Sequence, residues 1–178
     1  MTGIGHNGGP ELSGRGWRRH CWTEARRALL PHLPLNVVRR RVKRAKELGL
    51  DYSAYATVRA TTGRDIVGFL FSMNALGVLG DGAKIPERRL ARVEGITGAA
   101  RIGLAPESWR RPDALDAWAD APAPFSPWRE QARAMDDARG KMPGDAVLLV
   151  GAAPWEAAWS SAGRLAGYLS AASYFGDP

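Results

Sequence analysis

The chain has 178 residues and a formal net charge of +7, which limits it to one domain or two small ones. Its single cysteine, Cys21, excludes an internal disulfide framework. There is no apolar signal region and no apolar run near the roughly 18 residues of a membrane span, so we expect a cytoplasmic protein with no membrane partner.

The basic residues are concentrated in the first half of the chain. Residues 1–92 carry 17 lysine and arginine residues against 7 acidic ones, whereas residues 93–178 carry 8 against 11. The two net charges are therefore +10 and −3, which sum to the total of +7. This asymmetry predicts that the first half faces a polyanion and that the second half has a different task.

The predicted elements of the first half indicate a mainly α fold. Residues 1–16 are rich in glycine and are expected to form a flexible leader. Residues 17–98 are expected to form a basic helical module, an N-terminal bundle with a helix-turn-helix-like corner. Glycine and proline stops and helical apolar spacing place its helices at Trp17–Leu30, Leu35–Leu48, Asp51–Thr62 and Asp65–Leu76. The last of these is apolar on most sides and is predicted to be the centre of the core.

The second half is predicted to contain a single strand between helices. Residues 99–127 are rich in proline and are expected to connect the two halves. Residues 128–178 are expected to form a C-terminal helix-strand-helix unit. Its elements are a helix at Trp128–Arg139, a buried strand at Ala146–Val150 and a helix at Pro154–Ser173.

A basic helix precedes a sharp turn at Gly49. Between positions 36 and 46 the chain has six cations and no acid: Arg39, Arg40, Arg41, Lys43, Arg44 and Lys46. Gly49 can adopt the left-handed conformation that ends a helix, and Ala45 is small where two helices would meet. Leu50 follows as a buried anchor. Ala45, Gly49 and Leu50 are therefore predicted to form a structural turn.

Residues 41–60 resemble the helix-turn-helix motif of phage repressor and Cro-type DNA-binding proteins. One departure is Arg44, which stands where the motif usually has an apolar residue. The resemblance implies that cations of the first helix contact phosphates and that the second helix faces the major groove. The implied nucleic-acid-binding residues are Arg39, Arg40, Lys43 and Lys46 in the first helix, and Ser53, Thr57, Arg59 and Arg64 in or after the second. Small groove-facing side chains predict binding dominated by the nucleic-acid backbone.

A second candidate site follows the predicted strand Ala146–Val150. Gly151 begins a turn and Pro154 begins a helix, an arrangement whose backbone N–H groups can hold an anion. This unit loosely resembles the last strand-helix unit of haloacid dehalogenase-like phosphatases. That family needs a pair of aspartates after an early strand, and the chain contains no Asp-x-Asp. Handling of a small phosphate ligand at residues 151–155 is therefore kept as an alternative.

The leading hypothesis is a non-enzymatic, transcription-associated protein that binds DNA. The main alternative is an adaptor whose basic helix contacts an acidic protein. Tryptophans in the second half favour core packing, a protein partner or self-association; these are Trp109, Trp118, Trp128, Trp155 and Trp159. No metal site is expected, because the chain has no CxxC or HxxxH pair. No cofactor and no catalytic residue are predicted either.

Overall fold

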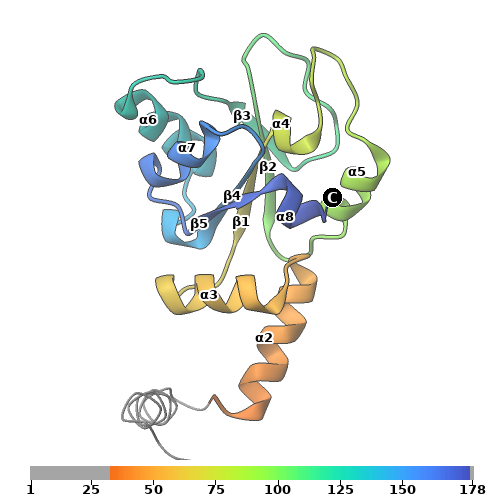
Figure 1. Ribbon diagram of the computed structural model, residues 1–178, viewed down its shortest axis with the longest axis vertical. Helices are drawn as coiled ribbons and strands as arrows, with labels where there is room; N and C mark the ends of the chain where they lie inside the picture. The colour runs from red at the N-terminus through yellow and green to blue at the C-terminus, as the bar shows by residue number, and fades with distance from the viewer. Residues whose placement is uncertain (1–32, 177–178) are drawn as a thin grey trace, which may run out of the picture. The chain divides into compact units, whose positions relative to one another are not determined.

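The computed structural model describes residues 33–176, which contain one sheet of five parallel strands in the order β3-β2-β1-β4-β5 (Figure 1). The strands are β1 (Gly68–Ser72), β2 (Ala100–Ala105), β3 (Ala117–Asp120), β4 (Val147–Gly151) and β5 (Gly167–Ser170). The helices are α2 (Leu35–Glu47), α3 (Tyr52–Thr62), α4 (Met73–Leu76), α5 (Glu87–Glu94), α6 (Trp128–Arg139), the 3-10 turn η1 (Gly144–Ala146), α7 (Glu156–Ala162) and α8 (Ala171–Phe175). The chain divides between Val38 and Arg39 into two units, and the second contains the sheet and every element from α3 onward.

The fold is therefore α/β, and the prediction of a mainly α protein is wrong. The helix predicted at Asp65–Leu76 is strand β1 followed by the short helix α4. The helix predicted at Pro154–Ser173 is interrupted by strand β5. All five residues of β1 are buried. A strand buried on both faces carries a continuous apolar run, which helical spacing cannot distinguish from a buried helix.

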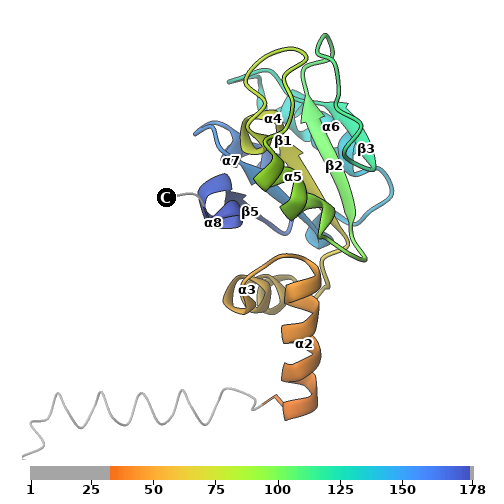
Figure 2. The same ribbon diagram turned by 90° about the vertical axis from the view of Figure 1, so that its right-hand side faces the viewer.

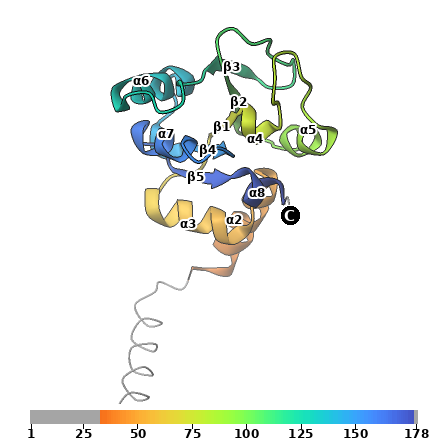
Figure 3. The same ribbon diagram turned by 45° about the horizontal axis from the view of Figure 1, so that its top comes forward.

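Helices cover both faces of the sheet (Figures 1 and 3). On one face Phe71 of β1 packs with Tyr174 of α8, and α5 contributes to the same cluster. On the other face Leu70 of β1 packs with Met135 of α6 and Trp159 of α7. Neighbouring residues of one strand thus belong to different clusters, because successive side chains of a strand point to opposite faces.

Helices α2 and α3 meet at a corner formed by Gly49 (Figure 2). Gly49 has a φ of 65° and its N–H donates to the Lys46 carbonyl over 3.0 Å. The Leu50 N–H donates to the Ala45 carbonyl over 2.8 Å. This pair of bonds is the Schellman arrangement, which needs a left-handed residue and so favours glycine. Ala45 and Leu50 are both buried.

Arg44, the cation that departs from the motif, connects α2 to the sheet. Its guanidinium donates to the Asp65 carboxylate over 3.0 Å and to the carbonyl oxygens of Ile66, Thr97 and Gly98 over 3.0, 3.1 and 2.9 Å. These partners lie just before β1 and β2. The side chain is only 19% exposed. Arg44 therefore attaches the corner to the amino ends of two central strands, and its charge is used inside the fold.

The predicted leader (residues 1–16) and the predicted helix Trp17–Leu30 lie outside the described residues. Among residues 33–176, no helix combines the length and the apolar character needed to cross a membrane.

Candidate functional site

The chain changes direction across the sheet between β1 and β4. The connection after β1 leads to β2 on one side, and the connection after β4 leads to β5 on the other. In open parallel sheets, ligands bind in the crevice outside the carboxyl ends of strands at such a switch point. Here β1 ends at Ser72 and β4 ends at Gly151. The residues that follow these two positions therefore border the expected crevice.

The buried carboxylate of Glu156 joins the two strand ends. The residue is 1% exposed and accepts four hydrogen bonds from the described part of the chain. Its Oε2 accepts from Ser72 Oγ over 2.8 Å and from the N–H groups of Ala152 and Ala153 over 2.7 and 3.0 Å. Its Oε1 accepts from Asn74 Nδ2 over 2.7 Å. All four donors are neutral groups, so they solvate the carboxylate without cancelling its charge.

Two local features place this carboxylate. Ser72 caps α4, with its Oγ accepting from the Ala75 N–H over 3.0 Å, so its hydroxyl hydrogen is left for Glu156. Gly151 supplies space, because a Cβ at that position would lie 2.7 Å from Tyr168 Cε2 and 2.8 Å from Glu156 Oε2. Close packing leaves no room to move either group easily. Glycine at position 151 therefore permits the carboxylate to approach the end of β4.

A cavity of about 140 Å³ opens beside Glu156. Its polar wall consists of Ser72, Asn74 and Glu156, and its apolar wall includes Trp109, Trp155 and Trp159. Among the described residues that line it, Glu156 is the only one with a charge. The cavity thus combines a single buried anion with aromatic walls.

Tyr168 on β5 is also close to this carboxylate, since a Cβ at Gly151 would touch both residues. Burial, and then the negative charge of Glu156, raise the pKa of the Tyr168 phenol above its ordinary value. Both effects disfavour a second anion at this place. The Tyr168 phenol is therefore a neutral neighbour of the Glu156 carboxylate.

The residues after β1 differ from those that the haloacid dehalogenase-like resemblance requires. That family needs an aspartate pair after an early strand, and β1 ends at Ser72 and is followed by Met73 and Asn74. An amide and a hydroxyl bonded to Glu156 do not replace an aspartate nucleophile. Within residues 33–176, no group of three or more His, Cys, Asp or Glu side chains could hold a metal ion.

The predicted anion site at Gly151 and Pro154 coincides with the position of Glu156. The N–H groups of Ala152 and Ala153, which would face an anion, donate to the Glu156 carboxylate. Pro154 is exposed. Sequence reasoning missed Glu156. Its only signal was an acidic residue soon after a buried strand, with nothing to mark it as buried.

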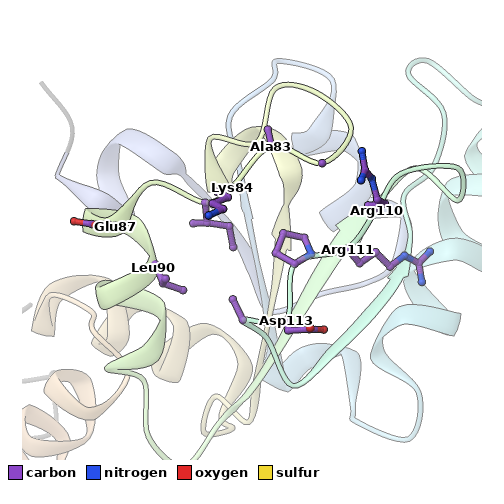
Figure 4. Close-up of a pocket in the computed structure, with 11 residues that line it drawn as sticks. Ala83, Lys84, Glu87, Leu90, Arg110, Arg111 and Asp113 are labelled. Carbon is purple, nitrogen blue, oxygen red and sulfur yellow. The ribbon is translucent and has the colours of Figure 1, made fainter.

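Two larger cavities in the described part of the chain lack a buried charge. The first, of about 470 Å³, lies between the loop before α5 and the loop after β2 (Figure 4). Lys84 and Leu90 lie on its α5 side, and Arg110 and Arg111 on the other. Both arginines have acidic partners, Asp81 and Asp120 respectively.

The second larger cavity, of about 540 Å³, lies between α6 and the turn after α7. Its lining includes Asp136 and Arg139, which pair with each other over 2.7 Å. Neither larger cavity lies at the switch point, and their charged residues are largely at the surface.

The cations predicted to contact phosphates are exposed on α2. They are Arg39, Arg40, Lys43 and Lys46. Lys43 Nζ lies 3.9 Å from the Glu47 carboxylate, and its side chain is exposed. Within residues 33–176, no ion pair involves the other three. The structure therefore brings these four side chains onto one helix with little acid beside them.

The residues predicted to face a major groove have fewer free polar groups. Ser53 and Thr57 lie on α3, where Ser53 is exposed, and the Thr57 hydroxyl donates to the Ser53 carbonyl over 2.9 Å. Arg59 is partly exposed. Arg64, beyond the end of α3, pairs with Asp145 of η1 over 2.8 Å. This group is therefore poorly equipped for reading bases.

No family model, curated protein or solved structure matches this chain. Function is therefore inferred from the chemistry of two features, the basic surface of α2 and the cavity beside Glu156.

Proposed function

We propose that the protein binds nucleic acid through the basic surface of α2, mainly by contacts to phosphates. The observation that supports this is a cluster of four exposed cations on the helix, of which only Lys43 has an acidic partner, Glu47, at 3.9 Å among the described residues. Arg39, Lys43 and Lys46 are spaced i, i+4 and i+7, so they share one face, and Arg40 flanks it. Lysine and arginine clustered in this way attract a polyanion and displace its counterions.

The inward orientation of Arg44 sharpens this proposal. A charge run is often only a solvated helix face, but Arg44 is bonded into the fold. It fixes the rotation of α2 relative to the strands, since its partners precede β1 and β2. The exposed cations are consequently presented by a helix held in one orientation.

Weak base recognition is part of the proposal. The exposed residues of α3 are small, and the hydroxyls of Thr57 and Thr61 donate to carbonyls within their own helix. Arginine, asparagine and glutamine, which make the usual paired contacts to bases, do not occur in the first turns of α3. Affinity should therefore vary little with sequence.

The test is the salt dependence of binding to random-sequence duplex DNA, measured by fluorescence anisotropy. Replacing Arg39, Arg40 and Lys43 together by alanine should flatten the log–log slope by about 0.9 for each phosphate that is no longer neutralised. Affinity should fall for all sequences alike, because phosphate contacts carry no sequence information.

A matched control removes the same number of charges elsewhere. Arg129, Arg133 and Lys141 are exposed on or just after α6, and their triple alanine variant should keep the original slope. Equal decreases in affinity for both variants would show that net charge alone drives binding. Absence of binding to duplex or single strands at about 50 mM salt would refute the proposal. If an acidic protein co-purifies with the chain, stays bound after nuclease treatment and is lost in the α2 triple variant, the adaptor alternative is favoured.

The phosphate-ligand alternative has less support. The N–H groups that it needs at residues 152 and 153 donate to Glu156, and that carboxylate would repel a phosphate.

A further inference from the structure

We infer that the cavity beside Glu156 binds a small organic ammonium group. This inference is independent of nucleic-acid binding, because the cavity lies at the carboxyl ends of the strands, whereas Arg44 of α2 contacts their amino ends. The Glu156 carboxylate is a buried charge. Buried carboxylates are normally paired with a cation, and no ion pair among residues 33–176 includes Glu156.

The hydrogen bonds of Glu156 show which kind of ligand group can approach it. Within the described residues, Oε2 accepts from three donors, whereas Oε1 accepts from Asn74 alone. Because Oε2 accommodates three donors and Oε1 only one, Oε1 has room for a further donor. A group that binds there must be a hydrogen-bond donor. A positively charged donor also supplies the charge that the neutral partners lack.

The walls of the cavity favour the same charge. Trp109, Trp155 and Trp159 come from the segment after β2, the turn after β4 and helix α7. Tryptophan is the strongest aromatic partner of a cation, and exclusion of water strengthens the attraction. An anion would face Glu156 without a compensating cation among the described residues of the lining. An ammonium group gains from both the carboxylate and the rings.

A strained aromatic residue contacts one tryptophan that lines the cavity. Phe125 has a φ of 58°, a conformation that bulky residues rarely adopt. The residue is 80% exposed, and the centroid of its ring lies 5.4 Å from that of Trp155. Such strain often persists where it serves a site. Here it keeps an additional ring beside a tryptophan of the cavity wall.

The volume limits the size of the ligand. A cavity of about 140 Å³ has room for roughly four or five water-sized groups. The space beside Glu156 therefore suits a short alkylammonium. A ligand of so few atoms is expected to bind with a Kd of roughly 1 mM.

The direct test compares n-propylammonium, 1-propanol and propionate at constant ionic strength, by calorimetry and tryptophan fluorescence. The ammonium should bind saturably, the alcohol about tenfold more weakly, and propionate not at all. Equal binding of the alcohol, tighter binding of propionate or the absence of saturable ammonium binding would overturn the inference.

Variants locate the binding. Glu156→Gln keeps the size of the side chain, removes its charge and should weaken ammonium binding about tenfold; a folded variant with unchanged affinity would refute the site. Trp155→Leu keeps the hydrogen bonds of the carboxylate and should weaken ammonium binding severalfold. It tests the site independently if Glu156→Gln does not fold. Trp128→Leu, an exposed tryptophan outside this cavity, should leave the affinity unchanged. The triple alanine variant of α2 should also leave it unchanged, which separates this result from the nucleic-acid result.

Discussion

Arg44 shows how a single residue can look anomalous in a motif and yet be required by the fold. In a helix-turn-helix pattern an apolar residue is expected at this position. In the structure, the guanidinium satisfies the Asp65 carboxylate and three backbone carbonyls at the amino ends of β1 and β2. An apolar side chain would leave these acceptors without this donor, and the bonds to Asp65 and Ile66 are partly buried.

We predict that Arg44→Ala lowers the free energy of unfolding by about 2 kcal/mol, because the partly buried acceptors of Asp65 and Ile66 and two exposed carbonyls lose their donor together. Urea denaturation monitored by circular dichroism measures the change. Arg40→Ala is the matched control, since Arg40 is exposed, and it should change stability by no more than about 0.5 kcal/mol.

Arg44→Lys separates charge from geometry. A single ammonium group cannot reach acceptors that the planar guanidinium bonds in several directions, so lysine should restore less than half of the lost stability. A lysine variant as stable as the original protein would show that only the positive charge matters.

At the scale of elements, sequence patterns succeeded where one face of a helix was exposed. The helix predicted at Leu35–Leu48 is α2 (Leu35–Glu47), and the helix predicted at Trp128–Arg139 is α6. The strand predicted at Ala146–Val150 is shifted by one residue in β4. In these segments polar residues, glycine and proline mark the limits of the element.

The other strands carry too little local information. Strand β1 is buried throughout, and its residues fit a buried helix equally well. Strands β3 and β5 have four residues each, so no period can be measured. The site around Glu156 could not be predicted for a related reason. Ser72 and Glu156 are 84 positions apart in the sequence, and only the sheet brings them together. A lone glutamate near a turn is ordinarily a surface residue.

The α2–α3 corner allows a prediction that separates backbone strain from packing. Gly49 and Gly63 both have left-handed backbones, with φ of 65° and 71°. A Cβ at Gly63 would meet nothing within 4 Å, whereas one at Gly49 would lie 3.2 Å from the Tyr174 hydroxyl. Gly63→Ala should therefore cost about 1 kcal/mol from strain alone, and Gly49→Ala about 2 kcal/mol. Thermal and urea unfolding measure both; equal costs would show that the Tyr174 contact is unimportant.

At the scale of the whole molecule, the sheet unites parts of the chain with opposite charge. Strand β1 belongs to residues 1–92, whose net charge is +10, and the other four strands belong to residues 93–178, whose net charge is −3. One sheet contains strands from all three segments that composition separates: the basic module (17–98), the proline-rich connection (99–127) and the C-terminal unit (128–178). Charge asymmetry along this chain therefore does not mark a boundary in the core.

The packing of this sheet also predicts how stability depends on pH. Burial raises the pKa of Tyr55, Tyr168 and Tyr174, and most strongly that of Tyr174, which packs against Phe71 of β1. In the unfolded chain the pKa of these phenols lies near its ordinary value of 10.0. The unfolded state therefore loses protons that the folded state keeps. The stability that depends on the neutral phenols is complete below pH 10 and is lost as the pH rises toward the folded pKa values.

Tyr174→Phe should consequently flatten the alkaline loss of stability. Tyr174 donates to the Leu48 carbonyl over 3.2 Å, so the variant should cost about 1 kcal/mol at neutral pH. Phenylalanine cannot ionise, however, and the difference from the original protein should shrink or reverse above pH 10. Urea midpoints measured on both sides of pH 10 test this, with the partly exposed Tyr52→Phe as control. If the urea midpoints of the original protein and of Tyr174→Phe fall in parallel above pH 10, ionisation of Tyr174 does not cause the alkaline loss of stability, and another group does.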